Sequence, residues 1–291
     1  MIIATCGGIG DQILAFQAAN RFCAEGGNCK PIIYSFSRKE VFEVLFTLFG
    51  NYFQIKHIDD EAEHKLLNDE TYRNKVFKDN EFGLVWPDLL WSHPLSLKLY
   101  DSHIQIVKQI RLLTKHLIPE NIIYFGLNTT TNGYLYNNIG QLLLNTARLL
   151  PNHTVYFPKI DKWNATPINI DLEFDFPKNV HIDTNPTFLK SLDYLKRSCY
   201  GVFADNGPSH IAYQLGLPRL VLDSRFGFNG LPWAARWRQD LTESIPISSS
   251  PSEIARLIKT NIEVPQTCLI PRHTVLVNQD VDWKQVLIIK Y

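Results

Sequence analysis

The sequence has few cysteines and does not space them as metal ligands. Five cysteines occur in 291 residues, and no two of them form a C-x-x-C pair. Secreted domains rely on paired cysteines and structural zinc sites on closely spaced ones, so this scatter predicts reduced thiols and no zinc site. The positions are Cys6, Cys23, Cys29, Cys199 and Cys268.

An excess of charge of either sign is also lacking. The chain holds 29 lysines and arginines against 29 aspartates and glutamates. This balance gives no overall field that would attract nucleic acid or an anionic membrane, although a local basic groove remains possible. No apolar run reaches the roughly 18 residues of a membrane span. The N-terminus lacks the charged region of a signal peptide, and these absences together predict a cytoplasmic protein without a transmembrane segment.

Several common catalytic signatures are missing as well. The sequence contains no P-loop, no nucleophile elbow, no H-E-x-x-H pair and no D-x-D motif at the end of an apolar strand. A metal-dependent transferase of the α/β class needs such acidic ligands at the end of a strand. We therefore expect no bound metal and no resident cofactor.

What the chain does contain is an alternation of short apolar runs with helical patterns. This alternation is typical of the α/β class with doubly wound parallel sheets, and 45% apolar residues are enough to build real cores. Pro119 precedes a new apolar run, which predicts domains at 1–118 and 119–265 and a tail, 266–291, that packs back on them. Predicted strands are 2–4, 31–34, 52–58, 82–86, 122–127, 154–157, 180–182, 201–204 and 220–222; predicted helices are 39–49, 89–115, 139–150 and 187–198.

The segment GVFADNGPSHIAYQLGLPRLVL, residues 201–222, predicts a strand, a sharp turn, a helix and a second strand. A glycine-containing turn that opens a helix presents free backbone N–H groups and the positive end of the helix dipole, which suits a phosphate. The donor side chains Ser209 and His210 fall in the first helical turn. The alternative is an ordinary capped βαβ corner, with Asn206 or Ser209 as the N-cap and Asp205 near the dipole.

The chain begins with a second strand–turn–helix pattern, MIIATCGGIGDQILAFQAANRF. Its glycines, Gly7, Gly8 and Gly10, do not have the dinucleotide spacing G-x-G-x-x-G, but they let a substrate approach the backbone closely. Asp11 follows them at the carboxyl end of the first strand, where open α/β sheets place their chemistry. Alternatively, Asp11 only provides a favourable charge at the start of a helix.

These two segments resemble the paired signatures of the heptosyltransferase-type (GT9-like) glycosyltransferases. IGDQILAFQAANRF is similar to their opening G-D signature, and ADNGPSHIAYQLGLPRLVL to their second, D-x-G-x-x-H-x-A-x-x-x-G-x-P. The resemblance implies a GT-B enzyme, in which two Rossmann-like domains face a cleft. The N-terminal domain would bind the acceptor and the C-terminal domain the nucleotide-sugar donor.

The resemblance further implies an inverting, metal-independent transfer of a hexosyl, pentosyl or heptosyl group. Asp11 would be the general base, and the donor diphosphate would lie at Asp205, Asn206, Gly207, Ser209 and His210. The acceptor hydroxyl would belong to a glycan such as lipopolysaccharide, a protein, or a modified base of phage DNA. Two other readings stay open: a catalytically degenerate nucleotide-sugar-binding protein, and a GT-B epimerase or hydrolase that acts on a nucleotide-sugar.

Two polar segments complete the candidate site. The loop NTTTNGYLYNN, residues 128–138, lacks the lysine usual in the family, which puts ADP-heptose as donor in doubt. Thr130 could supply a hydroxyl to the diphosphate, and Tyr134 or Tyr136 could stack on the base; the alternative is a plain polar loop. Residues 219–238 interleave arginines with aromatics, and a weak acceptor groove is predicted at Arg225, Trp233 and Arg236.

Overall fold

The computed structural model divides the chain into two compact units. One unit is Met1–Ile106 with Val275–Tyr291, and the other is Val107–Thr274. Within them the structure describes residues 2–6, 9, 10, 12, 13, 32–36, 39–49, 54–58, 61, 65, 69–72, 75, 83, 84, 119–129, 135–160, 174–214, 217–224 and 242–264.

The first unit contains a parallel four-stranded sheet. Its strands are β1 (Ile2–Cys6), β2 (Ile32–Phe36), β3 (Gln54–Ile58) and β4 (Gly83–Leu84), in the spatial order β3-β2-β1-β4. Helix α2 (Lys39–Phe49) lies between β2 and β3 in the chain, and its Val41, Val44 and Leu45 are buried. Apolar residues at this spacing share one face of a helix, which explains why the segment packs by one side.

The second unit contains a parallel six-stranded sheet. Its strands are β5 (Glu120–Gly126), β6 (Thr154–Pro158), β7 (Val180–Asp183), β8 (Ser198–Ala204), β9 (Arg219–Asp223) and β10 (Thr242–Pro246). The spatial order is β10-β9-β8-β5-β6-β7, with parallel pairing throughout. The chain thus enters the sheet at β5, adds β6 and β7 on one side, and returns to the other side of β5 with β8.

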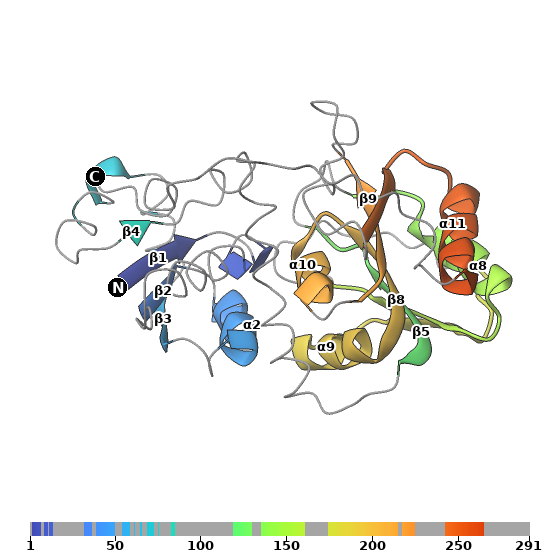
Figure 1. Cartoon of the computed structure of the whole chain (residues 1–291), viewed down its shortest axis with the longest axis horizontal. Coiled ribbons are helices and arrows are strands. Elements are labelled where there is room, and N and C mark those ends of the chain that lie inside the picture. The colour runs from blue at the N-terminus through green and yellow to red at the C-terminus, as the bar shows by residue number, and fades with distance from the viewer. Residues whose placement is uncertain are drawn as a thin grey trace. The chain divides into compact units, whose positions relative to one another are not determined.

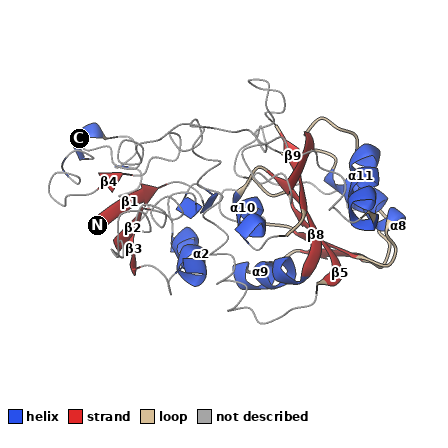
Figure 2. Cartoon of the chain, viewed as in Figure 1, coloured by secondary structure: helices blue, strands red, loops and turns tan. Residues whose placement is uncertain are grey.

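Helices cover both faces of this second sheet. They are α8 (Ile139–Leu149), α9 (Phe188–Arg197), α10 (Gly207–Gln214) and α11 (Pro251–Glu263). The helices α8 and α11 lie on one face, while α9 and α10 lie on the other (Figure 1). Figure 2 shows the strands as a red layer between the blue helices. Strands that are covered by helices on both faces consist of nearly continuous apolar residues, and the strands of this sheet have such sequences.

The two faces of the sheet carry different sets of strand side chains. Alternate residues of a strand point to opposite faces, so Ile123 and Phe125 join a mixed aliphatic and aromatic core with α8 and α11. Tyr124 takes the other face, where its ring centroid lies 5.5 Å from that of Tyr156 and 5.8 Å from that of Phe203. The face under α9 and α10 is therefore built largely of stacked aromatic rings.

The predicted α/β class is confirmed, and the predicted elements within the described residues exist with bounds shifted by a few positions. The helix predicted at 39–49 has the same bounds in the structure. Two elements were not predicted, β10 and α11. The helix predicted at 89–115 and the tail at 266–291 lie outside the described residues.

Candidate functional site

The order of strands in the second unit creates a topological switch point. The chain leaves β5 toward β6 on one side, and it leaves β8 toward β9 on the other. In open α/β sheets the loops at such a point diverge and leave a crevice at the carboxyl ends of the two strands. The loop after β8 is the predicted signature turn, so the structure places Asp205, Asn206 and Gly207 at this position.

Asn206 joins the signature turn to the neighbouring strand. Its side-chain Nδ2 donates to the carbonyl oxygens of Gly126 and Asn128, each at 2.7 Å. Its Oδ1 accepts a hydrogen bond from the Ser209 backbone N–H at 3.1 Å, so Asn206 is also the N-cap of α10. Both amide protons are committed to the chain, which makes Asn206 a bridge between the loops after β5 and β8.

The first turn of α10 presents fewer backbone donors than the sequence predicted. Pro208 has no N–H, the Ser209 N–H is capped by Asn206, and the His210 N–H reaches the Asn206 carbonyl oxygen at 3.4 Å. Within the described residues, no hydrogen bond engages the N–H of Gly207. The expectation of several free N–H groups is therefore wrong, because Asn206 and Pro208 account for most of them.

Besides the Gly207 N–H, the start of α10 offers the side-chain hydroxyl of Ser209 as a donor. The Ser209 side chain is fully buried, and its Oγ has no hydrogen-bond partner among the residues that the structure describes. A buried hydroxyl without a partner costs roughly 1–3 kcal/mol, so such groups point to a ligand or water that completes them. His210 lies beside it, 4% exposed, and Asp205 is half-buried in the turn.

Gly126 at the end of β5 lets the signature turn approach the sheet. A Cβ at this position would lie 2.5 Å from Phe203 Cδ1 and 3.3 Å from the Cβ of Pro208. Only a glycine therefore fits under both the Phe203 ring and the start of α10. Sequence reasoning missed this residue, although a glycine that ends an apolar strand is the signal of a close approach.

The loop after β5 is fixed by a second asparagine. Asn128 Nδ2 donates to the Pro158 carbonyl oxygen at 2.6 Å, and Asn128 Oδ1 accepts from the Ile160 N–H at 3.0 Å. These two bonds tie the loop after β5 to the loop after β6. Sequence reasoning did not assign Asn128 a role, since nothing in the sequence indicates which loops are neighbours.

Tyr136 does not have the predicted stacking role. Its ring is 3% exposed within the core that α8 and α11 cover, and its hydroxyl donates to the Ser249 carbonyl oxygen at 3.1 Å. This placement corrects the expectation that Tyr136 stacks on a base. Thr129, in the loop after β5, is buried at 6% exposed.

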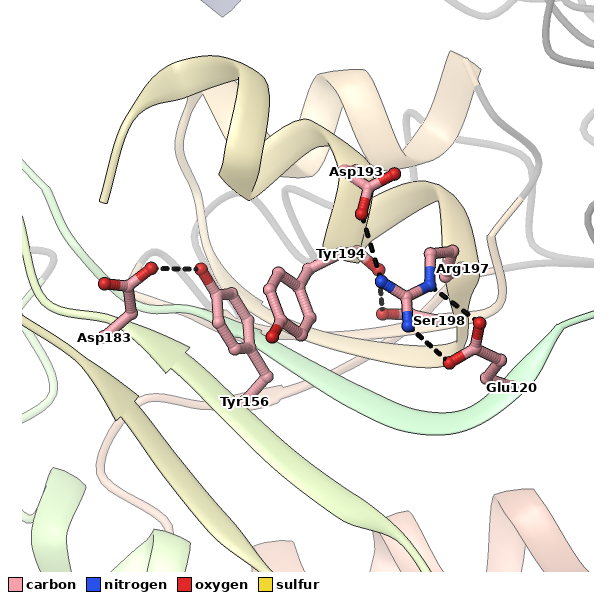
Figure 3. A network of polar contacts seen from close by, with 7 residues as sticks. All are labelled: Glu120, Tyr156, Asp183, Asp193, Tyr194, Arg197 and Ser198. Atoms are coloured by element: carbon pink, nitrogen blue, oxygen red, sulfur yellow. Dashed lines mark hydrogen bonds and ion pairs between the residues drawn. The ribbon is translucent and has the colours of Figure 1, made fainter. Parts of the chain in front are cut away.

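A polar network lies on the aromatic face near the carboxyl end of β7. Asp183 Oδ2 accepts from the Tyr156 hydroxyl at 3.0 Å and pairs with Lys190 Nζ at 2.8 Å (Figure 3 shows the Tyr156 contact). The ring of Tyr194 stacks on Tyr156 with centroids 3.8 Å apart. Burial raises the pKa of Tyr156, so its hydroxyl stays protonated and continues to donate.

The Asp183 carboxyl has competing influences on its pKa. Burial acts to raise the pKa, while hydrogen bonds from Lys190, Tyr156 and the Asn185 N–H lower it and prevail. Asp183 therefore remains ionised at neutral pH. The network braces β6, β7 and α9 against one another beside the candidate site.

The structure describes only part of the N-terminal strand–turn–helix motif. Gly10 is buried at the start of a helical segment, and the buried Gln12 accepts from the Ser35 hydroxyl of β2 at 2.7 Å through Oε1. This contact ties the segment after the first turn to the sheet, as a strand–turn–helix pattern requires. Asp11, Gly7 and Gly8 lie outside the described residues, as do Thr130, Tyr134, Arg225, Trp233 and Arg236. Their roles stay predictions.

The described residues contain neither a cluster of metal ligands nor a helix that could span a membrane. No group of three or more His, Cys, Asp or Glu side chains in this part of the chain is arranged to hold a metal ion. Among the same residues, no helix combines the length and apolarity needed to cross a bilayer.

Comparisons with known proteins give a match in structure only. Neither a scan against protein-family models nor a search of curated proteins finds a match. Structures of the E. coli heptosyltransferase WaaC with ADP and with ADP-2-deoxy-2-fluoro heptose match with TM-scores of 0.58 and 0.56. Each match covers 90% of this chain and 100% of WaaC at 11% sequence identity.

A UDP-GlcNAc 2-epimerase from Neisseria meningitidis, bound to UDP-GlcNAc, also matches. The match covers 91% of this chain and 92% of the epimerase at 14% identity, and its TM-score of 0.46 is too low to carry an argument. Identities at this level establish a fold and not an activity. The chain has the α/β GT-B fold of the heptosyltransferase WaaC, the fold that its two motifs predicted.

Proposed function

We propose that the protein is a metal-independent, inverting glycosyltransferase. It would move a sugar from a nucleotide-sugar donor to a hydroxyl acceptor on a glycan such as lipopolysaccharide, on a protein, or on a modified base of phage DNA. The observation that carries this proposal is the position of the signature turn at the switch point of a GT-B fold. The orphaned Ser209 hydroxyl in that turn supports it further.

The donor diphosphate would lie at the start of α10. The positive end of the helix dipole, the Gly207 N–H and the Ser209 hydroxyl would stabilise the negative charge that develops as the bond to the sugar breaks. Asp205 and His210 flank the same turn and would orient the diphosphate or the sugar. This arrangement supplies fixed dipoles where a metal ion acts in other transferases.

The acceptor would be activated by Asp11. Its carboxylate would take the proton from the acceptor hydroxyl as the oxygen attacks the anomeric carbon. The bond from that carbon to the diphosphate oxygen would break at the same time, and its electron pair would leave on the nucleoside diphosphate. A single displacement of this kind inverts the anomeric centre.

Nucleotide binding and turnover test the proposal in two stages. In a melting panel of ADP, UDP, GDP and CDP and their sugar conjugates, one nucleotide should stabilise the wild type, by about 2.7 kcal/mol at 100 times its dissociation constant. Asp205→Ala and Gly207→Trp should abolish that stabilisation. If no nucleotide stabilises the wild type, the glycosyltransferase proposal is wrong.

Turnover assays then distinguish a transferase from the alternative functions. Asp11→Asn should abolish sugar transfer while nucleotide binding persists. Release of free sugar or an epimer without any acceptor would instead indicate a hydrolase or epimerase. Binding without turnover, across acceptors from each class, would indicate a catalytically degenerate binding protein. Salt-sensitive affinity for duplex DNA would favour the DNA acceptor.

A further inference from the structure

The ring of Phe203, on β8, lies across two glycines of the sheet. Strand pairing places Gly126 of β5 directly beside Phe203, and Gly201 precedes Phe203 by two residues on the same face of β8. A Cβ at Gly126 would lie 2.5 Å from Cδ1 and 2.8 Å from Cε1 of the ring, and a Cβ at Gly201 would lie 2.7 Å from Cζ. The ring therefore occupies the space that two side chains would otherwise fill.

The same two glycines face the two ends of α10. The Cβ of Pro208, in the first turn of α10, lies 3.3 Å from the Cβ position of Gly126. The Cδ2 of Leu217, which follows the helix, lies 3.1 Å from the Cβ position of Gly201. Helix α10 packs against β8 (Figure 1). The ring of Phe203 thus shares the space above each glycine with one end of the helix.

Neighbouring rings fix the orientation of the Phe203 ring. Phe203 is fully buried, and the Tyr124 ring lies 5.8 Å from it between centroids, with an angle of 26° between the ring planes. Tyr124 is itself buried and packs against Tyr156. Because protein interiors are close-packed, the Phe203 ring cannot turn upright without displacing Tyr124 or α10.

The position of the first turn of α10 needs two kinds of contact. The hydrogen bond from Asn206 to the Gly126 carbonyl oxygen ties this turn to the end of β5. A hydrogen bond along the edge of the sheet does not set how closely the turn approaches the face of the sheet, whereas a packed ring does. The donors that we assign to the diphosphate, the Gly207 N–H and the Ser209 hydroxyl, belong to this turn.

We propose that Phe203 is the positioning residue that sets the distance between the first turn of α10 and the sheet, and through it the affinity for the donor diphosphate. This inference rests on the proposed function and names the residue that keeps its binding turn in place. Phe203 acts through the turn and does not contact the ligand. Donors that are already in place bind an anion more tightly than donors that must first be ordered.

Calorimetry with Phe203→Leu tests the positioning role. The probes are the tightest-binding of ADP, UDP, GDP and CDP, and the matching uncharged nucleoside. Leucine leaves a gap over the glycines into which the first turn can move, so the diphosphate should bind about tenfold more weakly while the nucleoside binds as it does to the wild type. Melting curves establish that each variant is folded at the temperature of the titration.

Phe157→Leu is the matched control for loss of a buried ring. Phe157 of β6 is also fully buried, but it belongs to the core on the opposite face, which α8 and α11 cover. Phe157→Leu should lower the melting temperature as Phe203→Leu does and leave the affinity for the diphosphate unchanged. If it weakens the diphosphate as much as Phe203→Leu does, any loss of packing has this effect and the positioning role is wrong.

Gly126→Ala has opposite expected effects in two backgrounds. In the wild type, the added methyl group would meet the Phe203 ring and Pro208, so it should displace the turn and weaken the diphosphate. In the Phe203→Leu background, the same methyl group fills part of the space that the ring has left and should restore part of the affinity. Equal losses in the two backgrounds would overturn the positioning role.

The outcomes distinguish this inference from the proposed function. If the wild type binds a nucleoside diphosphate and Phe203→Leu binds it equally well, the positioning role is wrong and the proposed function stands. Equal loss for the diphosphate and the nucleoside would also contradict a role that acts through the first turn of α10. If the wild type binds none of the four, the proposed function and this inference both fall.

Discussion

Asparagine side chains donate to backbone carbonyl groups at both ends of the six-stranded sheet, but the two ends differ in what they can bind. At the carboxyl end of the strands, the amide of Asn206 bridges backbone carbonyls of the loop after β5. At the amino end, the amide nitrogen of Asn179 lies 3.2, 3.3 and 2.9 Å from the carbonyl oxygens of Ala147, Leu150 and His153. In both places an asparagine side chain donates to backbone carbonyl oxygens near the end of a strand or helix.

What separates the two ends is the sign of the helix dipole. Because each helix runs antiparallel to the strands it packs against, helix N-termini gather at the carboxyl end of the sheet and C-termini at the amino end. Asn206 caps the positive end of α10, while Asn179 caps the negative end of α8. The amino end also carries the ion pair of Arg197 with Glu120, shown in Figure 3. An anion is therefore favoured at the carboxyl end only.

The largest effect is expected for Asn206→Ala. This change removes the N-cap of α10 and the amide that donates to the carbonyl groups of Gly126 and Asn128. It should lower the free energy of unfolding by about 3 kcal/mol and abolish the nucleotide-dependent rise in melting temperature. Urea denaturation and the nucleotide panel measure the two effects.

Asn206→Ser is the matched control, since serine keeps the cap but cannot bridge to β5. Its stability should fall between those of the wild type and Asn206→Ala. If Asn206→Ser is as stable as the wild type, the bridge from Asn206 to β5 contributes nothing to the free energy of unfolding. Asparagine would then have no shared stabilising role at the two ends of the sheet.

Much of this architecture was predictable from local sequence. The helix at Lys39–Phe49 was predicted with correct bounds because its apolar residues recur at helical spacing. The signature turn was predicted because Gly207, Pro208 and Ser209 together form a helix start after an apolar strand. The helix α11 was missed even though Ser250 caps it and Pro251 occupies its first turn, which are local signals of the same kind.

The bridges at the site could not be predicted in this way. Asn206 contacts residues that precede it by 78 and 80 positions, and Asn128 contacts a loop 30 to 32 positions away. Which loops meet depends on the strand order, and the sequence does not encode that order locally. The need for glycine at position 126 has the same origin, because Phe203 and Pro208 reach it only once β8 lies beside β5.

A smaller effect, on stability alone, is expected for Asn179→Ala at the amino end. Loss of the amide leaves the last carbonyls of α8 without a side-chain donor and should cost about 1–2 kcal/mol of unfolding free energy. Affinity for the nucleoside diphosphate should not change, because the site lies at the other end of the strands. A fall in affinity comparable with that of Asn206→Ala would show that the two ends do not differ in function.

The smallest effect is a pH dependence that originates at Asp183. Its pKa is lowered in the folded protein, so the ionised carboxylate stabilises the fold above the pKa of the unfolded chain. That contribution is lost as the pH falls through the folded-state pKa. Asp183→Asn should therefore melt below the wild type at pH 7 and lose less stability than the wild type between pH 5 and about pH 3.

Asp193→Asn, on the exposed side of α9 where Asp193 pairs with Arg197, is the matched control for loss of a carboxylate. An exposed pair within one helix contributes little to stability, so this variant should follow the wild-type acid profile. If Asp183→Asn also follows that profile, the buried carboxylate does not contribute the acid sensitivity. The network with Tyr156 and Lys190 would then act through packing of the stacked rings and not through the charge of Asp183. Such a result would mean that stability at the carboxyl end of the sheet, like stability at the amino end, comes from hydrogen bonds and packing. The helix dipole would then be the feature that distinguishes the two ends.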